Sequence, residues 1–238
     1  MNNLKDQVEG ITKGLDVLFI IFSGSLVLTM QIGFAMLCAG SVQAKNVRNT
    51  MLKNFLDLCV CAVTFFFVGF AFAYGDEDEE GGSVSFIGTT SFFLNDVTEG
   101  KDYARFFIQV GFAASTTTIV CCSIVERSRF VAYIWYSIFL SGFVYPVVAR
   151  SIWSPSGFLS AHGGDDKDLF LGVGVIDWAG SGVVHITGGC TALGKRHSQR
   201  IMDENSTWLL YLNLPLQKLF LHHCSWRNYS WPAHRSLL

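Results

Sequence analysis

Charged side chains are scarce in this sequence, and their scarcity excludes several classes of protein. Asp, Glu, Lys and Arg make up 15% of the 238 residues, whereas soluble domains usually carry about 25%. The formal net charge is −2, so a broad basic surface for nucleic acid is not expected. Low charge alone proves little, but here the charges cluster between long apolar runs. This distribution is typical of repeated membrane spans.

Metal-binding patterns are missing as well. The chain has seven cysteines, but neither Cys59-x-Cys61 nor Cys121-Cys122 has the spacing of zinc ligands. We expect the cysteines to pack as small apolar residues between helices rather than to form disulfides. His222, His223 and Cys224 are adjacent in sequence, and adjacent residues rarely complete a metal site. No metal and no other cofactor is therefore expected.

The apolar runs predict five membrane-spanning helices, because about 20 helical residues cross a hydrocarbon core of about 30 Å. The expected fold class is all-α, a polytopic membrane helix bundle occupying residues 14–193. The fifth run is rich in glycine, which membrane helices tolerate because it lets backbones approach closely. The predicted spans are Gly14–Gly40, Asn54–Tyr74, Phe106–Val125, Phe130–Ala149 and Leu169–Leu193.

The loops between these spans differ in charge. Lys and Arg follow the first, third and fifth spans, whereas acidic residues dominate after the second and fourth, as in the run Asp76–Glu80. Because Lys/Arg-rich loops face the cytoplasm, residues 1–13 are predicted to be extracellular and residues 194–238 a cytoplasmic tail. Residues 1–14 lack a short apolar core with a cleavage site, so the first span is expected to be its own insertion signal.

Two ionisable residues, Asp177 and His185, fall within the fifth run. Ionisable groups are costly to bury in a membrane, so each is a candidate functional residue. On one ideal helix they would be about 12 Å apart along the axis, too far to share a proton or a metal directly. Two structural interpretations remain open: Asp177 as a carboxylate capping a helix N-terminus, and His185 as a hydrogen-bond partner of a neighbouring helix.

The segment around them, Asp177–Gly189, reads DWAGSGVVHITGG and resembles the signature of the ammonium transporter family (Amt/Mep/Rh). Gly33–Asn46, GFAMLCAGSVQAKN, is similar to plant-type members. IVER at 124–127, FVAY at 130–133 and GFVYP at 142–146 also look like the family. The resemblance covers about residues 15–194, in the expected order and spacing.

The resemblance implies roles for four residues. Phe112 and Trp153 match two aromatic residues at the outer mouth of the pore, where an aromatic face attracts a cation by roughly 0.5–2 kcal/mol. Asp177 matches an acid that supports the cation site electrostatically without binding the cation itself. His185 matches the first of two pore histidines, which handle the deprotonated species or relay a proton. Without the resemblance, Phe112 and Trp153 would be interpreted as core and interfacial aromatic residues.

Family members have about eleven helices, built as two inverted five-helix repeats and a final helix, and assemble as trimers. By this resemblance we expect the chain to hold the first repeat only, as a truncated or alternatively spliced product. The expected function is transport of ammonium, ammonia or methylammonium across a lipid bilayer, in a homo- or hetero-trimer and with the plasma membrane as the expected location. The alternative is a non-transporting subunit that modulates full-length relatives. An enzyme is not expected, because no set of nucleophile, base and orienting group is apparent.

Overall fold

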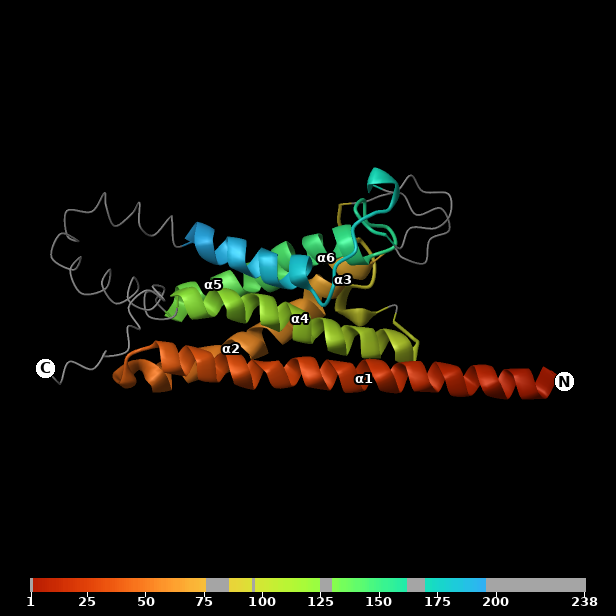
Figure 1. The fold of residues 1–238 in the computed structure, drawn as a ribbon, viewed down its shortest axis with the longest axis horizontal. Coiled ribbons are helices and arrows are strands. Elements are labelled where there is room, and N and C mark those ends of the chain that lie inside the picture. Colours follow the sequence, from red (N-terminus) through yellow and green to blue (C-terminus); the bar gives the residue numbers. More distant parts are fainter. Residues whose placement is uncertain (1, 76–85, 96, 125–129, 162–169, 196–238) are drawn as a thin grey trace, which may run out of the picture. The chain divides into compact units, whose positions relative to one another are not determined.

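The computed structural model describes residues 2–75, 86–95, 97–124, 130–161 and 170–195. Packing divides the chain into two units, residues 1–193 and 194–238. Nearly all of the second unit, the predicted cytoplasmic tail, lies outside the described residues, as do the acidic run Asp76–Glu80 and the cluster from His222 to Cys224. In the described part of the first unit, helices form the bundle shown in Figure 1 and no strand longer than an isolated bridge occurs. The all-α prediction is confirmed.

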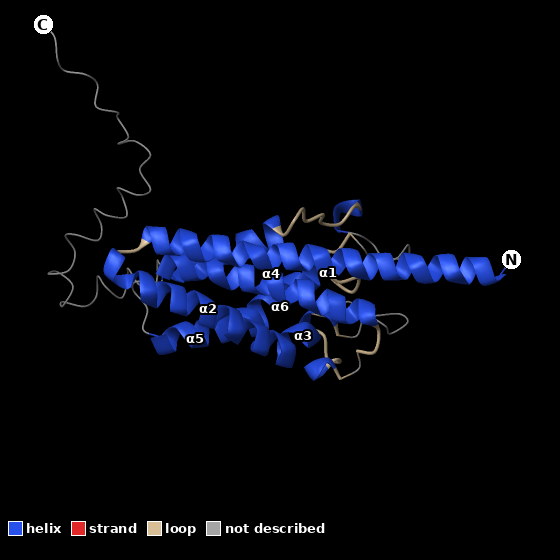
Figure 2. Cartoon of the chain, turned by 90° about the horizontal axis from the view of Figure 1, so that it is seen from below, coloured by secondary structure: helices blue, strands red, loops and turns tan. Residues whose placement is uncertain are grey.

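Helix α1, Asn2–Ser41, is the longest element of the bundle. Its 40 residues extend about 60 Å at 1.5 Å per residue, twice the thickness of a hydrocarbon core. The N-terminal part of α1 projects beyond the other helices in both Figure 1 and Figure 2. Helical structure thus also runs through residues 2–13, ahead of the span predicted to begin near Gly14. The extracellular location of those residues stays a prediction.

The second and fourth spans are each interrupted by a π-helical turn. The second consists of α2 (Val47–Thr64), η2 (Phe65–Gly69) and α3 (Phe70–Tyr74). The fourth consists of α5 (Phe130–Phe139), η4 (Leu140–Val144) and α6 (Tyr145–Trp153), so it ends four residues later than predicted.

These two π-helical turns pack against each other at positions where glycine is needed. A β-carbon on Gly69 would lie 2.9 Å from the Ser141 carbonyl oxygen, and one on Gly142 would lie 2.8 Å from Thr64 Cγ2. Both distances are too short for a real side chain, so glycine at 69 and 142 permits the contact.

Helix α4, Gly100–Ile124, contacts α1, α2 and the fourth and fifth membrane segments. Around its middle α4 is buried on all sides and carries small and hydroxylated residues, including the run from Ala113 to Thr118. Several of these hydroxyls donate to the carbonyl one turn earlier, as Ser115 Oγ does to Gly111 O at 2.9 Å, which satisfies their polarity inside the helix. Gln31 of α1 joins these residues by donating from Nε2 to Ser115 Oγ at 3.0 Å.

Four helices are long and apolar enough to cross a membrane among the described residues: Leu4–Ser41, Ala44–Tyr74, Gly100–Ile124 and Phe130–Trp153. The prediction that Leu169–Leu193 forms one further continuous helix was wrong. After the short η5 turn (Phe170–Gly172), the chain is irregular until η6 (Ser181–Ile186), and helical structure then continues to residue 195. Positive φ angles at Gly172, Gly174, Ala179 and Gly180 are incompatible with a continuous right-handed helix.

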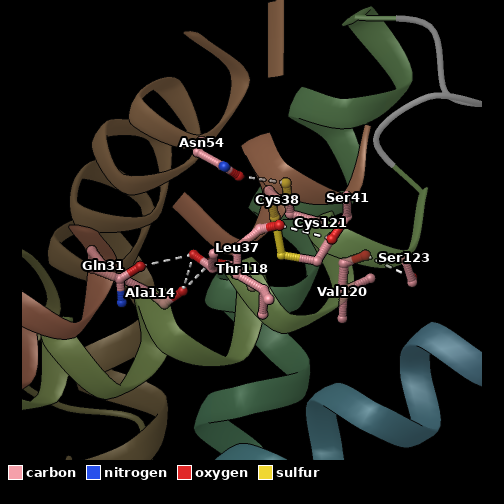
Figure 3. Close-up of a disulfide and its surroundings, with 12 residues drawn as sticks. Gln31, Leu37, Cys38, Ser41, Asn54, Ala114, Thr118, Val120, Cys121 and Ser123 are labelled. Atoms are coloured by element: carbon pink, nitrogen blue, oxygen red, sulfur yellow. Dashed lines mark hydrogen bonds between the residues drawn. A yellow bond between two sulfur atoms is a disulfide. The ribbon is translucent and has the colours of Figure 1, made fainter. Parts of the chain in front are cut away.

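A disulfide between Cys38 and Cys122 links α1 to α4 (Figure 3). The expectation that all cysteines act as packing residues was therefore wrong for this pair. The partners are 84 residues apart, and only the packing of α1 on α4 brings them together. Free thiols are found at Cys59, Cys61, Cys121 and Cys190 in the described part of the chain.

Arg150 of α6 is buried at the end of the bundle where α3 ends, with 1% of its surface exposed. Its Nη1 donates to the Gly75 carbonyl at 2.7 Å and lies 3.5 Å from the Ala73 carbonyl oxygen. Carbonyls at a helix C-terminus have no partner within the helix, so Arg150 caps α3 from a neighbouring span.

Candidate functional site

Two aromatic rings from different helices meet near this end of the bundle. Phe112 lies on α4 and Trp153 is the last residue of α6, and their ring centroids are 5.3 Å apart at an interplanar angle of 59°. Both rings are half-buried and pack against the main apolar core. The structure thus brings together the two aromatic residues singled out in the sequence, although their role is untested by this contact.

Asp177 caps the N-terminus of the fifth segment's helix. Its Oδ1 accepts hydrogen bonds from Ser181 Oγ and Gly182 N, both at 2.8 Å, and its Oδ2 accepts from Val183 N at 3.1 Å. A carboxylate here satisfies free N–H groups and complements the positive end of the helix dipole. The capping interpretation of Asp177 is confirmed, whereas placing it on one helix with His185 was wrong because it precedes the helix.

His185 lies in η6, one turn into that helix, and its ring is exposed in the first unit. Its Nδ1 is 3.1 Å from the Gly180 carbonyl oxygen. Because a carbonyl oxygen can only accept, this contact places the ring proton on Nδ1 and leaves Nε2 as the acceptor. The hydrogen bond is thus made within the fifth segment and not to a neighbouring helix.

Gly180 connects the histidine to the aromatic pair, and the sequence analysis did not single it out. It has a left-handed φ of 77°, and a β-carbon there would lie 3.8 Å from Trp153 Cη2 and 2.8 Å from Val184 Cγ2. Glycine therefore allows the turn and avoids a clash with Val184, and Trp153 lies beside the backbone at this position. The signal that could have found it is the Ala179-Gly180 pair between a capping acid and a helix.

The fifth segment leaves a broad surface exposed beside this site. Besides His185, the large apolar side chains Trp178, Ile186 and Leu193 are exposed, with Trp178 at 82%. A line from the packed core to an open face of the first unit therefore passes four residues in order: Phe112, Trp153, Gly180 and His185.

Comparison with known proteins agrees with this architecture. Residues 18–205 match the sequence profile of the Ammonium Transporter Family. The chain belongs to this family. It is 46% identical over 180 residues to "Ammonium transporter 1 member 3" of Solanum lycopersicum and 49% identical over 183 residues to "Ammonium transporter 1 member 1" of Oryza sativa subsp. japonica.

The matched region is a limited part of each relative. It covers 75% of this chain and 37% of the tomato protein, and 76% of this chain and 36% of the rice protein. Among solved structures, "Sensor Amt Protein" is similar with a TM-score of 0.65 and 33% identity, over 77% of this chain and 44% of that one. The chain thus spans less than half the length of the family members it matches here.

Proposed function

We propose that this chain contributes the outer mouth and the first histidine of a pathway for ammonium across a membrane. The observation that carries the proposal is the Phe112–Trp153 pair, followed through Gly180 by the exposed ring of His185. Aromatic faces attract a cation by roughly 0.5–2 kcal/mol, so the pair would recruit ammonium or methylammonium. The Nε2 acceptor of His185 would then face the N–H donors of the cargo.

Asp177 would support the cation from a distance. Three donors of the fifth segment occupy its carboxylate, so it contributes negative charge beside the pathway instead of a direct ligand. This arrangement favours a cation near the mouth without holding it tightly.

The proposed orientation places the N-terminus outside and residues 194–238 in the cytoplasm, following the Lys/Arg distribution. We expect the sequons Asn205-Ser206-Thr207 and Asn228-Tyr229-Ser230 to remain unglycosylated, because glycosylation marks segments outside the cytoplasm. Glycosidase treatment of the chain expressed in yeast should leave its electrophoretic mobility unchanged. A control sequon introduced near residue 3 should acquire a glycan, and a glycan on Asn205 or Asn228 would contradict the orientation.

We also propose assembly into homo- or hetero-trimers, in which a second half of the family fold covers the exposed face of the fifth segment. A second candidate function follows from the span of the match, which is 36–37% of the two plant relatives. In that role the chain would associate with full-length transporters and alter their uptake without transporting ammonium itself.

Growth of yeast lacking its own ammonium transporters would test the first function. We expect no rescue by the 238-residue chain alone, and rescue by residues 1–193 joined to the second half of the tomato relative. His185→Ala in that chimera should lower methylammonium uptake at least about tenfold, equivalent to about 1.4 kcal/mol of barrier.

Cys190→Ala is the matched control, because Cys190 is also exposed and lies on the same helix. It should leave uptake unchanged, with membrane delivery of each protein verified by a tag. Uptake that is equally fast with and without His185 would refute the proposed pathway. A chain that changes the uptake of a co-expressed full-length relative, without uptake of its own, would support the modulating function instead.

A further inference from the structure

A second polar site lies inside the bundle, on a face of α4 different from the one that carries Phe112. Asp57 of α2 is 1% exposed, and its carboxyl faces the hydroxyls of Thr117 and Thr118 on α4 and Ser137 on α5. Thr117 and Thr118 are five and six residues beyond Phe112, which turns them about 120–140° away around the helix axis. The site around Asp57 is therefore separate from the proposed pore mouth.

The carboxyl of Asp57 is left without a hydrogen-bond partner. Neither of its oxygens completes a hydrogen bond, and the same is true of Ser137 Oγ, which faces it. Native interiors satisfy nearly all buried polar groups, so a buried carboxyl of this kind is suited to hold a ligand.

The surrounding groups direct their protons elsewhere. Thr117 Oγ1 donates to Ala114 O at 2.9 Å, and Thr118 Oγ1 lies 2.7 Å from the same carbonyl and 2.9 Å from Gln31 Oε1 (Figure 3). Each hydroxyl has a single proton, so both threonine oxygens present only lone pairs toward Asp57.

The polar side chains around these threonines also donate their protons to groups other than Asp57. Tyr136 Oη donates to Thr117 O at 3.1 Å, Tyr133 Oη donates to Cys121 Sγ, and Cys121 Sγ donates to Asn54 Oδ1 at 2.7 Å. None of these printed hydrogen bonds directs a proton at Asp57, and the two threonine oxygens that face it act as acceptors.

We propose that Asp57, Thr117, Thr118 and Ser137 bind one small monovalent cation inside the bundle. A single carboxylate balances one positive charge, and a buried charge is stable only when paired. A divalent ion such as Ca²⁺ would require six to eight oxygen ligands, commonly with several carboxylates. Sodium, which takes oxygen lone pairs, and ammonium, which donates four N–H groups, share the chemistry that this pocket offers.

Thermal unfolding of the full chain in lipid nanodiscs would test this site. With choline chloride as the reference at equal ionic strength, saturating sodium or ammonium should raise the unfolding midpoint by about 4 °C or more. A rise with ammonium alone, or with sodium alone, identifies the ion. Asp57→Asn should abolish the rise, whereas Asp16→Asn, a change at an exposed acid of α1, should retain it.

Two further measurements keep the test decisive if Asp57→Asn fails to accumulate. Thr118→Val and Ser137→Ala each remove one neutral ligand and should raise the half-saturating cation concentration about tenfold. Equal midpoints in choline, sodium and ammonium would overturn the proposal. So would an infrared carbonyl band of a protonated carboxylic acid that disappears in Asp57→Asn, because a proton would then occupy the place of the cation.

Discussion

Replacing Asp177 with alanine is expected to loosen the start of the fifth segment's helix and to lower ammonium uptake by the chimera at least tenfold. Asp177 accepts three hydrogen bonds from residues 181–183, and bonds to a charged group contribute about 1.5–3 kcal/mol each. Hydrogen exchange at the amides of Gly182 and Val183 should therefore accelerate at least about 100-fold. Asp16→Ala, at an exposed acid of another helix, should change neither rate.

Asp177→Asn distinguishes the helix-capping role of Asp177 from the effect of its negative charge on the cation. An asparagine side chain still offers one acceptor to the helix N-terminus, so the amides should stay largely protected while the negative charge is lost. If uptake falls in Asp177→Asn, the charge supports the cation, as proposed. Full uptake in both variants would show that Asp177 has no role in transport.

The second large effect is expected from Arg150→Met. The variant removes the donor that caps α3 and leaves the buried carbonyl of Gly75 without it, at a cost of about 3 kcal/mol. For a chain of this size the unfolding midpoint should fall by about 6–12 °C. Thermal unfolding in nanodiscs would measure the change.

Arg150→Lys and Arg48→Met complete this experiment. Lysine keeps the charge but lacks the planar fork of arginine, so an intermediate midpoint is expected. Arg48 is exposed near the start of α2, and its substitution should shift the midpoint by less than about 2 °C, since exposed positions contribute little. A midpoint of Arg150→Met equal to that of the unchanged protein would rule out the capping role of Arg150.

The spans could be predicted from sequence because long apolar runs determine them. The helices themselves extend beyond the apolar runs, with α1 beginning at Asn2 and α4 at Gly100, because helical hydrogen bonding can continue into polar residues that hydropathy does not count. The fifth helix was predicted too long because hydropathy does not register backbone conformation, whereas positive φ at Ala179 and Gly180 prevents the helix from beginning before Ser181.

The candidate site was predictable to a similar degree. The resemblance pointed to Phe112 and Trp153, and the structure places their rings in contact; their roles, and that of His185, stay predictions. The Cys38–Cys122 bond was beyond sequence reasoning, because two unrelated spans must pack before the thiols meet.

Asp57 was missed although the sequence carries a signal for it. An acid in the middle of an apolar span is itself a functional signal, and Asp57 lies within the predicted span Asn54–Tyr74. The criterion that selected Asp177 and His185 would also have selected Asp57.

The paired π-helical turns bear on how the fourth span tolerates changes in length. A π-helical turn closes its hydrogen bonds over five residues instead of four, so η4 accommodates one residue more than a regular α-helix would. Deleting one residue between Leu140 and Val144 would leave hydropathy and span length almost unchanged. Because η4 already holds the extra residue, the deletion would convert it to a regular α-helical turn, and Arg150 and Trp153 would keep their orientation. The same deletion in the regular helix α5 would instead rotate everything after it by about 100°. A one-residue deletion within η4 should therefore be tolerated better than one in the regular helical turns on either side of it.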